Sequence, residues 1–301
     1  MRRLIVNADD FGFTAGVNRG IVEGHSRGVV TSSTLMANGA AFSDAVQLAR
    51  TVPQLSVGCH VVLIDGVPLL DAGNISTPLQ QDLRDQKPGA RAFSESIGRF
   101  ALRALAGRLD PQEIEAEATA QIRKIQAAGI AVSHLDTHKH THLFPGVLRP
   151  LLRAGAACGV RAVRNPFGPR RPLRSGDLVS RPGIWTRYAE MRILQGFAGR
   201  FRAAVAKHGF ATPDGTLGVE VTGVIDEAMF RAIVSSIPDG TWEFVCHPGY
   251  NDADLAAAKT RLRQSREIEL RALTLPEARS ALSQAGVNLI SYRDLGPVPR
   301  T

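Results

Sequence analysis

The chain has 301 residues, of which 44% are hydrophobic and 21% are charged, a balance typical of a globular protein with a substantial core. No run approaches the roughly 18 apolar residues that cross a bilayer, the first residues do not resemble a signal peptide, and three scattered cysteines do not suggest a disulfide framework. We therefore expect a cytoplasmic protein, with a single domain over residues 1–301.

The net charge of +8 is concentrated between residues 149 and 208. This segment holds thirteen Arg or Lys against Asp177 and Glu190, a local +11, so the rest of the chain carries about −3. Such segments occur in proteins that bind nucleic acid, anionic membranes or acidic ligands. No nucleic-acid-binding motif accompanies it, and the segment lacks the interleaved aromatic residues of a base-stacking platform. We expect no nucleic-acid partner, and two interpretations stay open: a solvated surface and a peripheral contact with an anionic membrane.

Short apolar segments alternate along the chain with helical patterns. The predicted strands are residues 4–8, 29–37, 57–63, 129–132, 160–164, 217–221, 243–246 and 288–291. The predicted helices are residues 16–27, 42–50, 92–107, 110–128, 145–158, 185–207, 227–236 and 274–286. Two segments rich in Gly, Pro and charged residues, 64–90 and 166–185, are predicted loop insertions, and the first is a candidate lid or substrate wall.

This alternation predicts an α/β protein with seven or eight mostly parallel strands. Polar clusters follow several strands that lie far apart in the sequence. In a (β/α) barrel the carboxyl ends of all strands meet on one face. The sequence therefore favours a (β/α) barrel over an open sheet.

The densest group of titratable side chains runs from His134 to His142 and includes Asp136 and four of the eight histidines. It follows the predicted strand at 129–132, where α/β folds bind ligands. If the segment stays extended, alternate residues from 136 to 142 share one side. Histidine is the commonest metal ligand, so the cluster predicts a metal or acid–base site. A polar loop with hydrogen-bonded histidines is the alternative.

Other strands also end in polar groups. Asp9 and Asp10 follow the first strand, His60 lies in the third, and His247 follows the strand at 243–246. One carboxylate and two imidazoles with an open position form a hydrolytic metal site, in which the ion makes water acidic and polarises a carbonyl. A second carboxylate can then act as the base and another histidine as the acid. No Gly-rich phosphate loop or Gly-x-Ser-x-Gly elbow suggests another chemistry.

Four segments in this order resemble a known family. They are Asn7-Ala8-Asp9-Asp10-Phe11-Gly12, Gly58-Cys59-His60, the stretch His134 to His142, and Cys246-His247-Pro248-Gly249-Tyr250. Together they are similar to the YdjC-like carbohydrate deacetylases, which include chito-oligosaccharide deacetylase and the hopanoid-associated HpnK type. The resemblance runs from residue 4 to about 250 and is weaker over 64–109 and 166–215, where substrate choice would lie.

The resemblance implies a distorted βα barrel, often dimeric, that removes N-acetyl groups from amino sugars with one divalent metal. Matched position by position, Asp10, His60 and His138 correspond to the metal ligands. Asp9 corresponds to the general base and His247 to the general acid.

Four more residues are site candidates. We expect Asp136 to orient a metal ligand, as carboxylates behind a ligand do. His140 and His142 either line the substrate pocket or form hydrogen bonds within their own loop. Arg164, at another strand end, either contacts substrate or pairs with an acid.

The expected function is hydrolysis of an N-acetyl group by water that one divalent metal activates. The substrate would be a chito-oligosaccharide or an N-acetylglucosaminyl glycolipid. Family resemblance indicates magnesium, whereas the Asp and His donors also suit zinc or manganese. Two alternatives stay open: another metal-dependent hydrolase, acting on a phosphoester or a different amide, and a non-catalytic module that binds a sugar or lipid head group. A homodimer is also left open.

Overall fold

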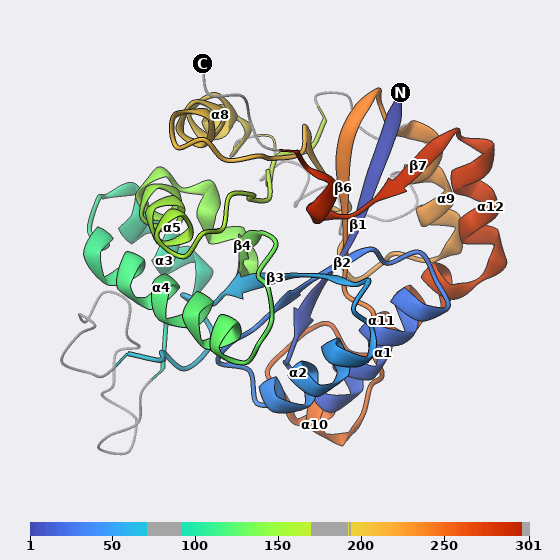
Figure 1. Ribbon diagram of the computed structural model, residues 1–301, viewed down its shortest axis with the longest axis horizontal. Helices are drawn as coiled ribbons and strands as arrows, with labels where there is room; N and C mark the ends of the chain where they lie inside the picture. The colour runs from blue at the N-terminus through green and yellow to red at the C-terminus, as the bar shows by residue number, and fades with distance from the viewer. Residues whose placement is uncertain (71–91, 95, 170–191, 193, 297–301) are drawn as a thin grey trace.

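A computed structural model describes residues 1–70, 92–94, 96–169, 192 and 194–296 (Figure 1). Most of the two predicted insertions, residues 71–90 and 170–185, therefore lies outside the described residues. In the described ranges the strands are β1 (Arg2–Phe11), β2 (Ser32–Leu35), β3 (Ser56–Val61), β4 (Leu135–Thr137), β5 (Gly215–Leu217), β6 (Gly240–Cys246) and β7 (Val287–Ile290). All of their pairings are parallel.

The strands form one curled sheet in the order β4-β3-β2-β1-β6-β5, and β7 pairs with the beginning of β1. Single bridges join Leu135 to Val163 and Ala162 to Ala211. Residues 161–163 thus connect the edge strand β4 to the chain that leads into β5, and the ends of the sheet approach each other. The structure confirms the predicted distorted barrel of parallel strands.

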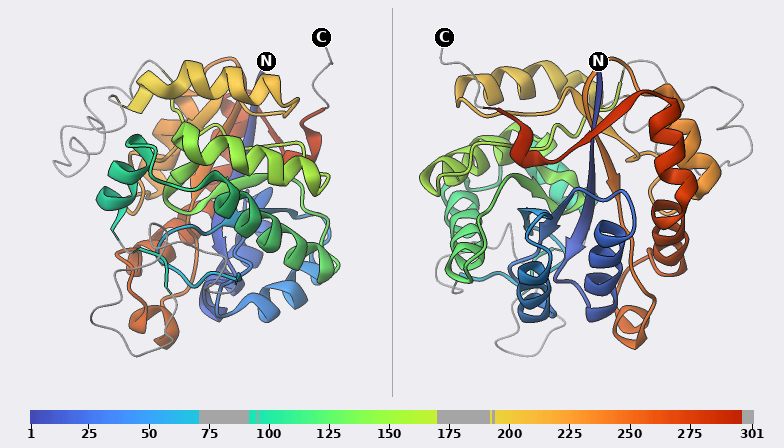
Figure 2. Two further views of the ribbon diagram at one scale, coloured as in Figure 1. Left: turned by 90° about the vertical axis from the view of Figure 1, so that its left-hand side faces the viewer. Right: turned by 45° about the vertical axis from the view of Figure 1, so that its right-hand side comes forward.

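Helices surround the sheet (Figures 1 and 2). In the described ranges they are α1 (Ala15–Ser26), α2 (Phe42–Thr51), α3 (Ile97–Leu105), α4 (Pro111–Ala127), α5 (Pro145–Ala157), α8 (Ala198–Lys207), α9 (Glu227–Ser236), α10 (Ala253–Ala257), α11 (Gln264–Thr274) and α12 (Pro276–Gln284). In Figure 1, α3, α4 and α5 lie on one side of the strands, and α9 and α12 lie on the other. None of the helices in the described ranges has the length and apolar content to cross a bilayer.

The alternation of side chains along β1 separates two environments. Leu4, Val6 and Ala8 belong to the main hydrophobic cluster, which includes side chains of α1. Ile5 instead packs with Tyr292 inside the barrel, because successive strand residues face opposite sides. Asn7 and Asp9 share the face of Ile5 by the same period. The barrel interior therefore becomes polar towards the carboxyl end of β1.

Some predicted elements shift. The strand predicted at 129–132 is wrong: Gly129, at φ 84°, follows α4, and β4 begins at Leu135. Leu135 is buried and pairs with Cys59, whereas Ile130 and Val132 are only partly buried. The pairing with β3 thus decides where the strand lies, and local hydrophobicity does not.

The boundaries of other predicted elements also move. A strand is predicted at 217–221, but β5 (Gly215–Leu217) ends at Leu217 because Gly218 adopts φ 94°. The predicted helix at 92–107 begins only at Ile97, where the Ser96 side chain accepts a hydrogen bond from the Arg99 N–H. Of the predicted helix at 185–207, the described part includes α8, with residues before 192 outside the description.

Candidate active site

A β-bulge brings two adjacent acids to one site. The register between β1 and β2 shifts between Ala8 and Phe11, and Asp10 adopts φ 70°. Neighbouring residues on a regular strand point to opposite faces, and a bulge re-aims one of them. Asp9 and Asp10 are both buried, and the carboxylate of each lies within 4.0 Å of a histidine at the carboxyl end of the sheet.

His60 and Asp136 are neighbours across β3 and β4. They stand opposite each other in the register, and His60 Nδ1 donates to Asp136 Oδ1 at 2.8 Å. A carboxylate that holds one ring nitrogen orients the other towards a metal. Burial opposes a charge on the ring, but Asp136 and the two acids of β1 raise the pKa of His60 to about 9. Both residues therefore lie where their expected roles require.

The chain after β4 is not extended, so the condition under which alternate residues from 136 to 142 would share one side is not met. His138–Leu143 form a 3-10 turn in which Lys139 and His140 adopt φ 54° and 53°. Non-glycine residues rarely adopt such angles, and when they do they cluster at functional sites. In the described ranges the other non-glycine residues with positive φ are Asp10 and Asp65, and Asp65 Oδ2 accepts from Lys139 Nζ at 2.7 Å. Asp10 belongs to the site itself, and Lys139 and His140 directly follow His138 in the chain.

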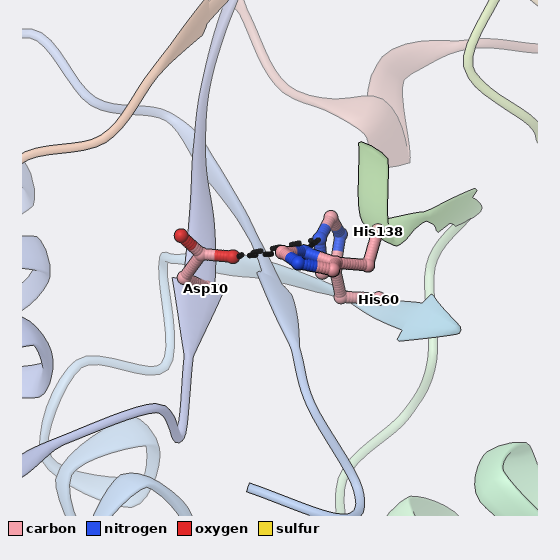
Figure 3. A group of neighbouring side chains, drawn as sticks. All are labelled: Asp10, His60 and His138. Carbon is pink, nitrogen blue, oxygen red and sulfur yellow. Dashed lines mark hydrogen bonds and ion pairs between the residues drawn. The ribbon is translucent and has the colours of Figure 1, made fainter. Parts of the chain in front are cut away.

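Asp10, His60 and His138 converge (Figure 3). Asp10 Oδ1 lies 3.6 Å from His60 Nε2 and 3.5 Å from His138 Nδ1, and the two nitrogens are 3.3 Å apart. Zinc binds nitrogen and oxygen at roughly 2.0–2.2 Å, and three atoms at these separations can share one ion at that distance. The donor set and its spacing fit a divalent metal, and these three residues could hold one.

Asp9, His60 and Asp136 form a second group of donors, and a guanidinium lies against it. Arg164 donates to both oxygens of Asp9, at 2.8 and 2.6 Å, and its Nη1 lies 2.6 Å from Asp136 Oδ2. Arg164 also donates to Glu243 on β6 at 2.6 Å and is fully buried. Burial works against ionisation, but Arg164 holds the pKa of Asp9 well below its usual range. Of its two expected roles, Arg164 has the geometry of a partner for acids.

The other histidines of the cluster differ in their surroundings. His142 Nε2 donates to the Arg164 carbonyl at 3.2 Å, and Nδ1 lies 2.7 Å from the Thr137 hydroxyl. Both ring nitrogens of His142 therefore have hydrogen-bond partners within the protein. His134 is buried and stacks on Tyr292. His140 Nδ1 is enclosed and has no hydrogen-bond partner in the described residues. Burial and Arg164 lower the pKa of His140 to about 3, so the ring is neutral.

His247 follows β6 and approaches the acids from another side. Its Nε2 lies 4.0 Å from Asp9 Oδ2, and its backbone N–H donates to Glu269 Oε2 at 2.6 Å. Burial lowers the pKa of His247 to about 4, against the attraction of Asp9 and Asp10. The ring is therefore neutral near pH 7, and it lies near Asp9 without a hydrogen bond to it.

Sequence reasoning missed several residues that support this site. Arg266 donates to Asp10 Oδ2 at 2.6 Å, Glu269 holds the His247 backbone, and Tyr292 donates to Glu243 at 2.6 Å. Arg266 and Glu269 lie inside α11, Glu243 lies inside β6 and Tyr292 follows β7, so none of them follows an apolar strand segment at the carboxyl end of the sheet. Each is nearly fully buried, but a charged residue inside an amphipathic pattern does not show its burial in the sequence.

The family comparison decides which family this chain represents. The family described as YdjC-like protein matches residues 3–284. The chain belongs to the YdjC-like family. Two relatives named carbohydrate deacetylase support this: one from Brevibacillus brevis is 32% identical, over 98% of this chain and 100% of its own length. One from Geobacillus stearothermophilus is 33% identical, over 97% and 98%.

Two solved structures share the fold of this YdjC-like protein. One, from Enterococcus faecalis, carries a name that refers to cellobiose-phosphate cleavage. It is 25% identical with a TM-score of 0.72 and covers 98% of this chain and 99% of its own. The other is a lactam utilization protein of Thermus thermophilus, which is 15% identical with a TM-score of 0.50 and covers 96% of this chain and 99% of its own. The second likeness concerns the fold alone.

Proposed function

We propose that this protein is a metal-dependent carbohydrate deacetylase that hydrolyses the N-acetyl group of an amino sugar. The observation that carries the proposal is the convergence of Asp10, His60 and His138 beside two candidate proton-transfer groups, Asp9 and His247. The names of the two carbohydrate deacetylase relatives, which align over nearly the whole chain, support the reaction class.

Each residue has a distinct role in this proposal. Asp10, His60 and His138 would hold one divalent ion. That ion would supply a Lewis acid, which makes water acidic enough for a weak base and polarises the substrate carbonyl. Asp9 is the base: Arg164 keeps it ionised and fixes both of its oxygens. The water oxygen bonds to the acetyl carbon as Asp9 accepts the water proton.

His247 completes the proton transfer. Its Nε2 lies 4.0 Å from Asp9 Oδ2, so it can take up a proton from Asp9 after small movements. With its pKa lowered to about 4 by burial, a protonated His247 is a strong acid. It delivers the proton to the amide nitrogen as the C–N bond breaks. The products are the free amino sugar and acetic acid, which releases its proton to give acetate, and Asp9 and His247 return to their starting states.

The remaining candidate residues support these groups. Asp136 orients His60 through its Nδ1, and Arg164 forms ion pairs with Asp9, Asp136 and Glu243. We assign the enclosed but unpaired Nδ1 of His140 to the substrate, since a sugar hydroxyl or the acetyl group could supply the missing partner.

A second candidate function is cleavage of a phosphorylated disaccharide, which the name of the Enterococcus faecalis protein suggests. A phosphorylated sugar would also suit the basic segment 149–208, in which Arg200, Arg202 and Lys207 on α8 are exposed. The same exposed charges keep peripheral binding to an anionic membrane as a prediction.

One assay separates these candidates. Metal-stripped protein is incubated with diacetylchitobiose, an N-acetylglucosaminyl glycolipid or phosphorylated cellobiose, with Mg²⁺, Mn²⁺ or Zn²⁺ added in turn. We expect metal-dependent release of acetate from one of the acetylated sugars. Disaccharide cleavage without acetate release would favour the second candidate. An absence of acetate from both acetylated substrates, in protein that binds the ion, would contradict the proposed substrate class.

A further inference from the structure

Arg266 is a buried cation that extends from α11 to the carboxylate of Asp10. Its side chain is 1% exposed. Nη2 donates to Asp10 Oδ2 at 2.6 Å, and Nε donates to the Leu262 carbonyl at 3.1 Å. The guanidinium carbon lies 5.8 Å from the centre of the Phe13 ring. Asp10 is 256 residues away in sequence, so the contact is purely tertiary.

The two adjacent acids of β1 are bound by their arginines in different ways. Arg164 engages both oxygens of Asp9. Arg266 engages only Oδ2 of Asp10, although a guanidinium can bind both oxygens of a carboxylate at once. Its Nη1 is buried and has no hydrogen-bond partner among the described residues. Oδ1 of Asp10 is left facing His60 Nε2 at 3.6 Å and His138 Nδ1 at 3.5 Å.

We propose that Arg266 is a positioning residue that reserves Asp10 Oδ2, so that Asp10 offers only Oδ1 to a divalent ion. This inference rests on the proposed metal-dependent function. The position of Arg266 restricts the number of protein ligands: one carboxylate oxygen and two imidazole nitrogens face the ion. Such a small mixed set suits zinc and similar transition ions. Calcium takes six to eight oxygens and often binds both oxygens of a carboxylate.

α11 is held where this role requires. The Arg266 carbonyl accepts from the Gly249 N–H at 3.3 Å, which ties the helix to the loop after β6. One turn further along α11, Glu269 accepts from the His247 backbone N–H at 2.6 Å. A single helix therefore contacts both the proposed metal ligand on β1 and the proposed acid after β6.

Removal of Arg266 would free Oδ2 for the ion. In Arg266→Met, which keeps a long side chain without donors, we expect Asp10 to bind through both oxygens. In Arg266→Lys the cation remains, but a single ammonium lacks the planar fork of Arg. Arg271→Gln is the matched control, because it removes one positive charge from the exposed side of the same helix.

Two measurements test the inference. The first is the crystal structure of the wild-type protein with bound Zn²⁺, in which we expect Asp10 Oδ1 on the ion and Oδ2 on Arg266. The second compares Zn²⁺ and Ca²⁺ affinities, together with the visible spectrum of bound Co²⁺, across the variants. We expect Arg266→Met to reduce the preference for Zn²⁺ over Ca²⁺ about 10–100-fold, the usual effect of a residue behind a ligand, and to weaken the Co²⁺ bands as coordination number rises. Arg271→Gln should match wild type.

Each outcome has one meaning. Both Asp10 oxygens on Zn²⁺ in the wild-type crystal would overturn the inference, even if no Arg266 variant folds. So would a Zn²⁺/Ca²⁺ preference and a Co²⁺ spectrum that are unchanged in folded Arg266→Met. One-oxygen coordination in a protein that releases no acetate would support the inference and count against the proposed function alone. A wild-type protein that binds no divalent ion would overturn both.

Discussion

Two groups of donors lie side by side at the carboxyl end of the sheet and share His60. In the first, Asp9 and Asp136 surround Arg164, which bonds to both acids and to Glu243. In the second, Asp10 and His138 face His60, and the nearby arginine touches only the far oxygen of Asp10. The chain supplies its own cation to the first group and leaves the converging donors of the second for an ion.

The difference has a physical reason. Buried carboxylates are costly unless a cation compensates them. Arg164 compensates three of them at once, and the excess negative charge raises the pKa of His60 despite burial. The same excess negative charge favours the binding of a second cation by Asp10, His60 and His138. The carboxylates of the first group therefore orient the His60 ring and favour its protonated form.

Asp9→Asn tests the chemistry of the first group and has the largest expected effect. It keeps the shape of the side chain but removes the proposed base. We expect the turnover of acetate release to fall by about 10²–10⁴-fold, the usual contribution of a general base, in protein that still binds the metal. Steady-state kinetics and metal titration of the same preparation provide the measurement. Near-wild-type turnover would reject Asp9 as the base.

Arg164→Met tests the structural side of the first group. It leaves three buried carboxylates without their cation, and breaking such a buried charge pair costs about 3–5 kcal/mol. Urea denaturation should report this loss in the free energy of unfolding. The control is Arg153→Met, which breaks the half-exposed pair with Glu115 and should cost no more than about 1 kcal/mol. Equal losses in the two variants would show that Arg164 has no special role.

Many residues of both groups could be proposed as site candidates from the sequence. Asp9, Asp10, His60, His138 and His247 follow or end apolar strand segments, and this position made them candidates, whereas their expected roles came from the family resemblance. Arg164 was found because it also lies at a strand end, although its partners could not be assigned. Strand-end reasoning works here because parallel strands gather their carboxyl ends on one face.

The rest depends on tertiary contacts that leave no local pattern. Arg266 and Glu269 look like ordinary polar residues of an amphipathic helix, and their partners lie more than twenty residues away. The exact place of β4 depends on its register with β3. Lys139 and His140 adopt left-handed angles, so the segment does not stay extended, and neither residue type signals such a turn.

Asp136→Asn should separate the orienting role of the first group from its charge. His60 Nδ1 loses its carboxylate partner, so we expect metal affinity to fall by about 10–100-fold, as it does when a residue behind a ligand is changed. Competition titration with a chelator measures the change. Glu115→Gln removes a carboxylate far from the site and should leave affinity unchanged. An affinity in Asp136→Asn equal to wild type would refute the link between the groups.

The pH dependence of metal binding also tests how the carboxylates act on His60, and its expected effect is smaller. The carboxylates, Asp136 foremost, outweigh burial and raise the pKa of His60 to about 9, and an imidazole must lose its proton to bind a metal. Affinity should therefore rise about tenfold per pH unit until about pH 9. Calorimetry in buffers of different ionisation enthalpy should detect one released proton.

The stability of the metal-free protein should move in the opposite direction. The folded-state pKa of His60 lies above its unfolded value of about 6.5. The stabilisation of the folded protein by protonated His60 is then complete below about pH 6.5 and is lost as the pH rises towards 9. For metal binding, an affinity that does not vary between about pH 6.5 and 9 would contradict the positive charge assigned to His60.

A titration of metal-stripped protein with Co²⁺ tests the proposed metal site directly when bound metal and acetate release are followed in the same samples. We predict that activity rises in proportion to bound metal and saturates at one ion per chain. We predict that His138→Ala binds Co²⁺ more weakly than the wild-type protein and releases no acetate. Full activity in metal-stripped protein, or an unchanged titration in His138→Ala, would contradict the assignment of Asp10, His60 and His138 as the metal site.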